Sequence, residues 1–223
     1  MDLIEKLKEF EKSINKIHSE EELQRIFYNE LAPTFLYGGN IKVREDFRVY
    51  IKTVEFYFHS EKPDGIHDPI VYHRNGRDLD DAPYFPLMSI HAHSSGFDIT
   101  FESKDEKYRA SALIRSYELI DIRDKKNGNK YKYLKWDSGN NKFLPSDNYC
   151  FNTQSTYLKA VLNGFAFKND NDITWEDVPR VKTKDLKVKT RQNVCKSESE
   201  WKYINTKKEK CDRNWSFTRE EEI

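Results

Sequence analysis

The sequence lacks the features that mark secreted, membrane and disulfide-rich chains. Only three of its 223 residues are cysteines, and Cys150, Cys195 and Cys211 have neither an even count nor a spacing typical of metal sites. We therefore expect unpaired structural thiols and a reducing, cytoplasmic location. No apolar run is long enough to span a bilayer, and no segment has the apolar stretch of a signal peptide, so we expect no membrane association.

The chain also lacks an excess of charge of either sign. Its 38 basic and 38 acidic residues cancel, so the whole-chain charge indicates no particular partner. The distribution is uneven, because residues 180–213 hold twelve Lys and Arg against five Asp and Glu, a local net charge of +7. Two interpretations stay open: this segment supplies the one basic face that nucleic-acid binding requires, or it is a solvated, partly disordered tail.

The composition predicts a very polar surface over an aromatic core. Charged residues make up 34% of the chain and aromatic residues 14%, with a mean hydropathy of −0.91, so the core must rely on Phe, Tyr, Ile and Leu. The length allows one large domain or two small ones, and we expect one. It would comprise a helical N-terminal cover (1–37), a sheet-based core (41–180) and a basic C-terminal segment (181–223).

Two N-terminal helices are expected to cover the sheet. Apolar residues at helical spacing predict the first helix over residues 3–17. Ser19 and Glu22 match a capping box, which predicts a second helix that continues to Leu31. Pro33 is expected to end that helix.

The remainder of the chain indicates an α+β fold, with a mainly antiparallel, strongly curved sheet covered by N-terminal and C-terminal helices. Residues 41–58 have a β pattern, and residues 60–85 form a loop too long to be a mere connection. Further strands are expected at Met88–His93 and Phe97–Glu102, and Arg109–Leu119 is read as a strand that could also be helical. A hairpin turn is expected at Asn127–Asn129, a helix at Ser155–Phe165 and the start of another helix at 172–177.

The most informative segment is 86–102, which combines histidines, serines, a glycine and two acids with alternating apolar residues. On a strand, Asp98, Thr100 and Glu102 share one face and the intervening apolar residues share the other. A sheet surface with so many polar groups is either a solvated outer face or the floor of a site.

A metal site is one alternative for this segment. His91 and His93 lie two residues apart and would face the same way on a strand, with Asp98, His67 or Glu55 completing the ligand shell. That histidine spacing is common by chance, and the other ligands come from distant segments. A metal-free site is therefore preferred.

Three further residues can carry chemistry. Glu55 shares a strand face with Tyr57, and a carboxylate desolvated by aromatic neighbours can act as a general base on water. His67 lies in the long loop, from which it could fold over a pocket. Arg115 stands among apolar residues and needs a partner, which could be Glu118, an acid on a neighbouring strand, or a phosphate. The structural alternatives are a solvent-facing Glu55, a surface His67 and a simple ion pair for Arg115.

Taken in order, these segments resemble the methylpurine (alkyladenine) DNA glycosylase family. Thr53-Val54-Glu55-Phe56-Tyr57 is similar to the family's Ile-Val-Glu-x-Glu-Ala-Tyr strand, and His67-Asp68 to the histidine that follows it. Ser89–Thr100 is similar to its Gly-x-x-Tyr-Val-Tyr-x-x-Tyr-Gly and Asn-Ile-Ser strands, and Leu113–Glu118 to its Leu-Leu-Arg-Ala-x-Glu-Pro segment. The resemblance covers roughly residues 41–120 and lies in the shared order of the pieces.

The resemblance implies a DNA glycosylase-like hydrolase of base excision repair, which cleaves the N-glycosidic bond of a modified base after base flipping. It implies that Glu55 activates the attacking water, and that Tyr57 and His67 stack on or hydrogen-bond the extruded base. Asp98 stands where the family has asparagine and would form part of the pocket wall, while Arg115 would contact a phosphate or brace the site.

The family inserts a tyrosine wedge into the duplex, and this chain has His93-Ser94-Ser95-Gly96 at the corresponding place. His91, His93 or a residue of the 60–85 loop could act as the wedge instead. We expect no cofactor, no metal and a monomer, with DNA or a nucleotide as the partner. Two alternatives remain: a non-enzymatic module that binds a nucleotide or nucleic acid on the same scaffold, and a metal-dependent hydrolase centred on His91 and His93.

Overall fold

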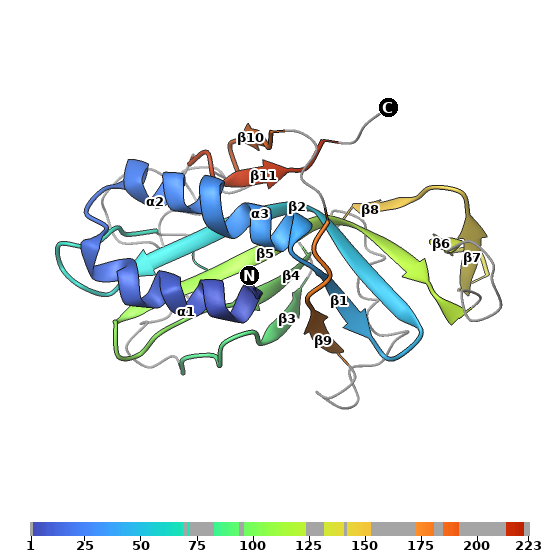
Figure 1. Ribbon diagram of the computed structural model, residues 1–223, viewed down its shortest axis with the longest axis horizontal. Coiled ribbons are helices and arrows are strands. Elements are labelled where there is room, and N and C mark those ends of the chain that lie inside the picture. The colour runs from blue at the N-terminus through green and yellow to red at the C-terminus, as the bar shows by residue number, and fades with distance from the viewer. Residues whose placement is uncertain are drawn as a thin grey trace.

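The computed structural model describes residues 2–68, 71, 83–93, 96–123, 132–140, 142–152, 173–180, 185–191 and 213–220. The fold is α+β, with N-terminal helices lying over one face of a large antiparallel sheet (Figure 1). The expectation of an α+β fold with a mainly antiparallel sheet is confirmed. Within the described ranges, no helix is long and apolar enough to cross a membrane.

The helical cover consists of α1 (Leu3–Ser13), the 3-10 turn η1 (Ile14–Lys16), α2 (Glu20–Ile26), the π-helical turn η2 (Phe27–Leu31) and α3 (Ala32–Tyr37). The expected cap is confirmed, because the Ser19 hydroxyl accepts a hydrogen bond from the Glu22 N–H. The prediction that Pro33 ends the helical region is wrong. Pro33 lies in the first turn of α3, where a missing N–H leaves no helical hydrogen bond unmade.

The sheet is built around two long central strands, β2 and β5. Its main path runs in the order β10-β11-β2-β5-β4-β3, while β1 and β9 extend from one end of β2, and β6, β7 and β8 extend from β5. The strands are β1 (Asn40–Val43), β2 (Phe47–Ser60), β3 (Ile90–His93), β4 (Gly96–Thr100), β5 (Tyr108–Asp121), β6 (Lys132–Asp137), β7 (Lys142–Ser146), β8 (Cys150–Asn152), β9 (Ile173–Glu176), β10 (Lys187–Lys189) and β11 (Ser216–Thr218).

The strands predicted over 41–58 and in 86–102 are present, and the segment Arg109–Leu119 is a strand rather than a helix. The expectation of a strongly curved sheet under C-terminal helices is wrong. The sheet is an open one with β10 and β3 at the ends of its main path, and the described part of the chain beyond α3 contains no helix.

The helix start expected at 172–177 is also wrong, because Ile173–Glu176 forms β9. Trp175 pairs with Ile41 on β1 and packs edge-to-face on Phe35, so pairing and packing across the fold outweigh the local capping pattern. The expected turn at Asn127–Asn129 and the expected helix at Ser155–Phe165 lie outside the described residues.

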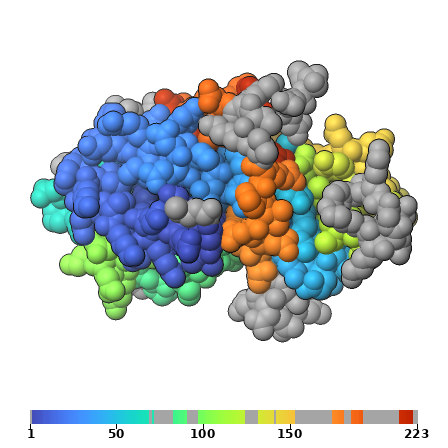
Figure 2. Space-filling view, in the orientation of Figure 1, coloured from blue at the N-terminus to red at the C-terminus, as the bar shows by residue number. Residues whose placement is uncertain are grey.

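The core lies between the helices and one face of the sheet. Phe56 stacks on Phe27 of η2 with ring centres 4.5 Å apart, and Phe58 meets Phe10 of α1 edge-to-face at 6.1 Å. Figure 2 shows the helical residues in blue over the side of the molecule that carries this layer. Because these aromatic side chains face the helices, the alternate residues of β2 face the opposite side of the sheet.

Candidate functional site

A row of directly paired residues crosses four strands of the sheet. Ser216 of β11 pairs with Glu55 of β2, which pairs with Leu113 of β5, which in turn pairs with Asp98 of β4. Directly opposed residues in an antiparallel sheet have their side chains on the same face. Since the neighbouring Phe56 faces the helices, this row lies on the face away from them.

This second face is polar but not solvated. Glu55 is fully buried, with 0% of its surface exposed, and Asp98 is 2% exposed. The structural alternative in which Glu55 lies on an open solvent face is therefore wrong. Burying a carboxylate is costly unless charge and hydrogen bonds compensate it, so its partners define what the site can do.

Glu55 accepts hydrogen bonds from Arg115 and Tyr57, which lie on the same face of the sheet. Arg115 donates from Nε to Glu55 Oε2 at 2.7 Å, and the Tyr57 hydroxyl donates to the same oxygen at 3.3 Å. Burial, and secondly the negative charge of Glu55, raises the pKa of the Tyr57 phenol. Tyr57 consequently remains a protonated hydrogen-bond donor at neutral pH, and Arg115 balances the charge of the carboxylate.

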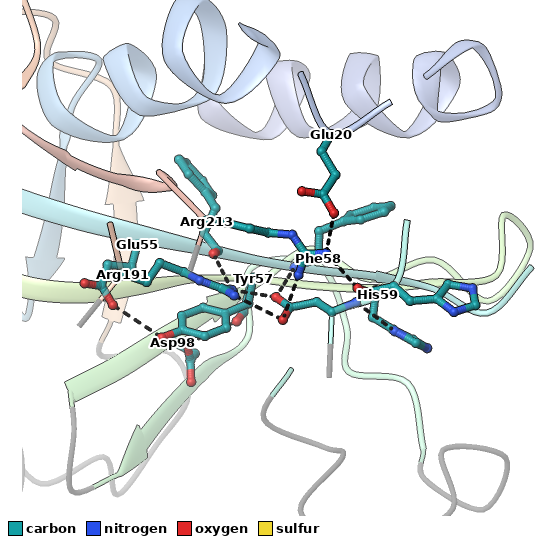
Figure 3. Close-up of polar contacts among 12 residues, drawn as sticks. Glu20, Glu55, Tyr57, Phe58, His59, Asp98, Arg191 and Arg213 are labelled. Carbon is teal, nitrogen blue, oxygen red and sulfur yellow. Dashed lines mark hydrogen bonds and ion pairs between the residues drawn. The ribbon is translucent and has the colours of Figure 1, made fainter. Parts of the chain in front are cut away.

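Asp98 is the second buried carboxylate on this face. It lies on β4, one strand beyond Leu113, and accepts a hydrogen bond from the Ser111 hydroxyl at 3.1 Å. Ser111 is itself the residue that pairs with Tyr57 on β2. The sheet therefore holds Glu55, Tyr57 and Asp98 on one surface, close to one another (Figure 3).

A second ionic cluster adjoins the ring of Tyr57. Arg191 contacts Asp68 through both ends of its guanidinium, with Nη1–Oδ2 at 2.5 Å and Nη2–Oδ1 at 3.1 Å, and both side chains are fully buried. The guanidinium carbon of Arg191 lies 4.5 Å from the centre of the Tyr57 ring. Burial alone lowers the pKa of Arg191, but the charge and hydrogen bonds of Asp68 outweigh it, so the net shift is upward.

The same aspartate is approached by a second arginine. Arg213 Nη1 lies 3.4 Å from Asp68 Oδ1. Its Nη2 donates to the backbone carbonyl of His67 at 2.8 Å and to Glu20 Oε1 of α2 at 2.6 Å. Figure 3 shows Arg191 and Arg213 approaching from the C-terminal part of the chain toward β2. The cluster thus joins the helices, the segment after β2 and the C-terminal strands.

The His67 side chain is placed apart from Glu55. Its Nε2 lies 2.9 Å from the backbone oxygen of Lys62, and its ring is tilted against His59 with centres 5.1 Å apart. The neighbouring Asp68, rather than the imidazole, extends to the cluster beside Tyr57. Of the residues proposed from the sequence, Tyr57 and Arg115 meet Glu55 directly, and Asp98 shares its face.

The backbone of β3 places His91 opposite Asp98 and His93 opposite Gly96. The side chains of these two histidines lie outside the described residues. Among the side chains that are described, no group of three or more His, Cys, Asp or Glu could hold a metal ion.

A cavity of about 240 Å³ lies on the helix side of the sheet, between η1 and the turn after β2. Ile14 and Phe58 supply apolar walls, and Asn15 bridges Lys62 and Glu106 at its rim. Its lining residues do not include Glu55 or its partners.

Sequence reasoning missed the contribution of the C-terminal segment. Part of this basic segment is buried rather than a solvated tail, because Arg191, Arg213, Trp215 and Phe217 are buried, whereas the residues of β10 are exposed. The alternation in Trp215-Ser216-Phe217 was a usable strand signal. No local pattern identifies Arg191 as the partner of Asp68, 123 positions away.

Comparison with protein-family models, with curated proteins and with solved structures finds no match to this chain.

Proposed function

We propose that the face of the sheet around Glu55 is the active site of a glycosylase-like hydrolase. Its substrate is the N-glycosidic bond of a modified base in DNA or in a nucleotide, and Glu55 is the group that activates water. The observation that carries the proposal is a fully buried carboxylate that contacts a phenol and a guanidinium on the sheet face away from the helices.

The chemistry follows from the charges of these groups. Glu55 accepts a proton from water, and the water oxygen bonds to the sugar carbon. The bond from that carbon to the base nitrogen breaks, and the base leaves with the electron pair of that bond. Arg115 orients the carboxylate through the hydrogen bond from its Nε to Glu55 Oε2. The neutral Tyr57 phenol donates to the same carboxylate and supplies a planar ring beside the reacting centre.

The second candidate is a binding module without turnover. It is favoured by the fact that Arg115 and Tyr57 both occupy Oε2 of Glu55, which is typical of a structural ion pair as well as of a catalytic carboxylate. Such a module would hold a nucleotide or nucleic acid on the same face and leave its bonds intact.

Base release separates the two candidates. Purified protein is incubated with oligonucleotides that carry hypoxanthine or an N-alkylated purine, as single strand and as duplex, and with the free nucleotides. Chromatography then detects the released base. The enzyme hypothesis predicts release by the wild type and its loss in Glu55→Gln, whereas binding without release supports the module.

A matched control tests whether loss of any buried carboxylate would abolish base release. Glu118 is also buried, lies on β5 and is paired with an arginine, Arg219, at 2.7 Å. Glu118→Gln should retain base release. Equal loss in both variants would indicate a general effect on folding and would count against the assignment of Glu55.

A further inference from the structure

Among the described residues, the strand pairing along the β11 edge of β2 ends beside Tyr57. β11 pairs with Thr53, Val54 and Glu55 of β2, and the Phe56 N–H then donates to the Trp215 carbonyl at 2.9 Å. β2 continues to Ser60. Buried backbone groups beyond this point still need partners, because an unmade hydrogen bond in the interior is costly.

The ion pair of Asp68 and Arg191 occupies this edge in place of a strand. Arg191 Nη1 donates to the Phe56 carbonyl at 3.2 Å, and the Phe58 N–H donates to Asp68 Oδ2 at 3.4 Å. These are the backbone groups on either side of Tyr57. One acid and one base thus satisfy an acceptor and a donor that a neighbouring strand would otherwise satisfy.

The same pair also contacts the side chain between those groups. The Arg191 guanidinium lies 4.5 Å from the centre of the Tyr57 ring and 5.2 Å from that of Trp215, so it is held between two aromatic faces. Because Asp68 binds both ends of the guanidinium, the orientation of Arg191 is fixed. The backbone and the ring of Tyr57 are therefore held by one rigid unit.

We propose that Arg191, oriented by Asp68, is a positioning residue that sets the Tyr57 phenol against Glu55. The effect of this positioning on the reaction rests on the proposed function, whereas the placement of Tyr57 by Arg191 does not. A positioned phenol matters because small displacements of groups around a reacting centre reduce turnover strongly. The C-terminal segment thereby completes the site through an arginine that itself touches no reacting atom.

Two spectroscopic readouts test the positioning without any substrate. In protein labelled with 13C-tyrosine, the ring signal of Tyr57 is identified by its loss in Tyr57→Phe, and hydrogen exchange reports the Phe58 amide. Arg191→Gln should shift the Tyr57 signal and accelerate exchange at Phe58. Arg191→Lys keeps the charge and removes the two-point contact, and it decides the question if Arg191→Gln fails to fold.

Arg219→Gln is the matched control, because Arg219 is a buried, ion-paired arginine of the same C-terminal segment whose partner is Glu118. It should leave the Tyr57 signal and the Phe58 exchange rate as in the wild type. Folded Arg191→Lys with an unshifted Tyr57 signal and wild-type exchange at Phe58 would overturn the proposal.

The kinetic arm uses a single-stranded oligonucleotide containing hypoxanthine. Arg191→Lys should lower kcat about tenfold or more with little change in KM, since a displaced phenol affects the reacting centre. Arg219→Gln should change neither constant. An unchanged kcat together with a shifted Tyr57 signal would refute the catalytic consequence. Absence of base release by the wild type would refute the proposed function, while the spectroscopic arm would still test the positioning.

Discussion

Replacing Arg115 should show how much of the free energy of unfolding depends on the buried ion pair between Arg115 and Glu55. In Arg115→Gln, Glu55 keeps its buried place but loses the guanidinium that lies 2.7 Å away, and the two side chains are 1% and 9% exposed. Breaking a buried ion pair by removing one partner costs about 3–5 kcal/mol. For a chain of this size that corresponds to a fall in Tm of about 6–20 °C, at about 2–4 °C per kcal/mol.

Urea unfolding at neutral pH measures this loss, and a surface pair provides the scale. Lys6 and Glu9 are 2.8 Å apart but 20% and 50% exposed, so Lys6→Gln should cost at most about 1 kcal/mol. The double variant Glu55→Gln with Arg115→Gln should recover part of the loss, because it leaves no uncompensated charge.

A loss in Arg115→Gln no larger than that in Lys6→Gln would refute the reasoning.

Three further predictions concern the core, a buried phenol and a glycine. Phe56→Ala should cost about 3–5 kcal/mol in urea unfolding, because the ring is fully buried and stacks on Phe27. Burial raises the pKa of Tyr57 above its ordinary value of 10.0, so the unfolded chain releases this proton first. The contribution of Tyr57 to the free energy of unfolding is complete below about pH 10 and falls at higher pH. Urea unfolding at alkaline pH should therefore show a shallower decline of this free energy in Tyr57→Phe than in the wild type. Gly39→Ala should lower Tm, because the added carbon would lie 2.3 Å from the Glu176 carbonyl oxygen; an unchanged Tm would contradict that geometry.

The parts of the fold that could be predicted are those specified by neighbouring residues. The Ser19 cap and the apolar stripe of α1 depend on contacts within a few positions, and both are present. The prediction that Glu55 and Tyr57 share a strand face was right, since the Tyr57 hydroxyl bonds to Glu55 while Phe56 packs against Phe27 on the other face. Arg115 does pair with an acid, and of the acids expected it is one on a neighbouring strand, Glu55 of β2.

The parts that could not be predicted depend on contacts between distant segments. β9 forms because β1 offers it a partner, so the local pattern at 172–177 indicated a helix instead. The pair of Asp68 and Arg191 likewise joins two segments that no sequence pattern relates. The basic character of the C-terminal segment suggested an exposed surface, yet part of its charge is balanced inside the protein by Asp68 and Glu20.

We propose that the Glu55 carboxylate activates water and is not only the ion-pair partner of Arg115. The most direct measurement is the single-turnover rate of base release from one hypoxanthine-containing oligonucleotide by the wild type, Glu55→Gln and Glu118→Gln. We predict that Glu55→Gln is slower by about 100-fold or more while Glu118→Gln stays near the wild-type rate. Release by folded Glu55→Gln at a rate close to that of the wild type would contradict the claim.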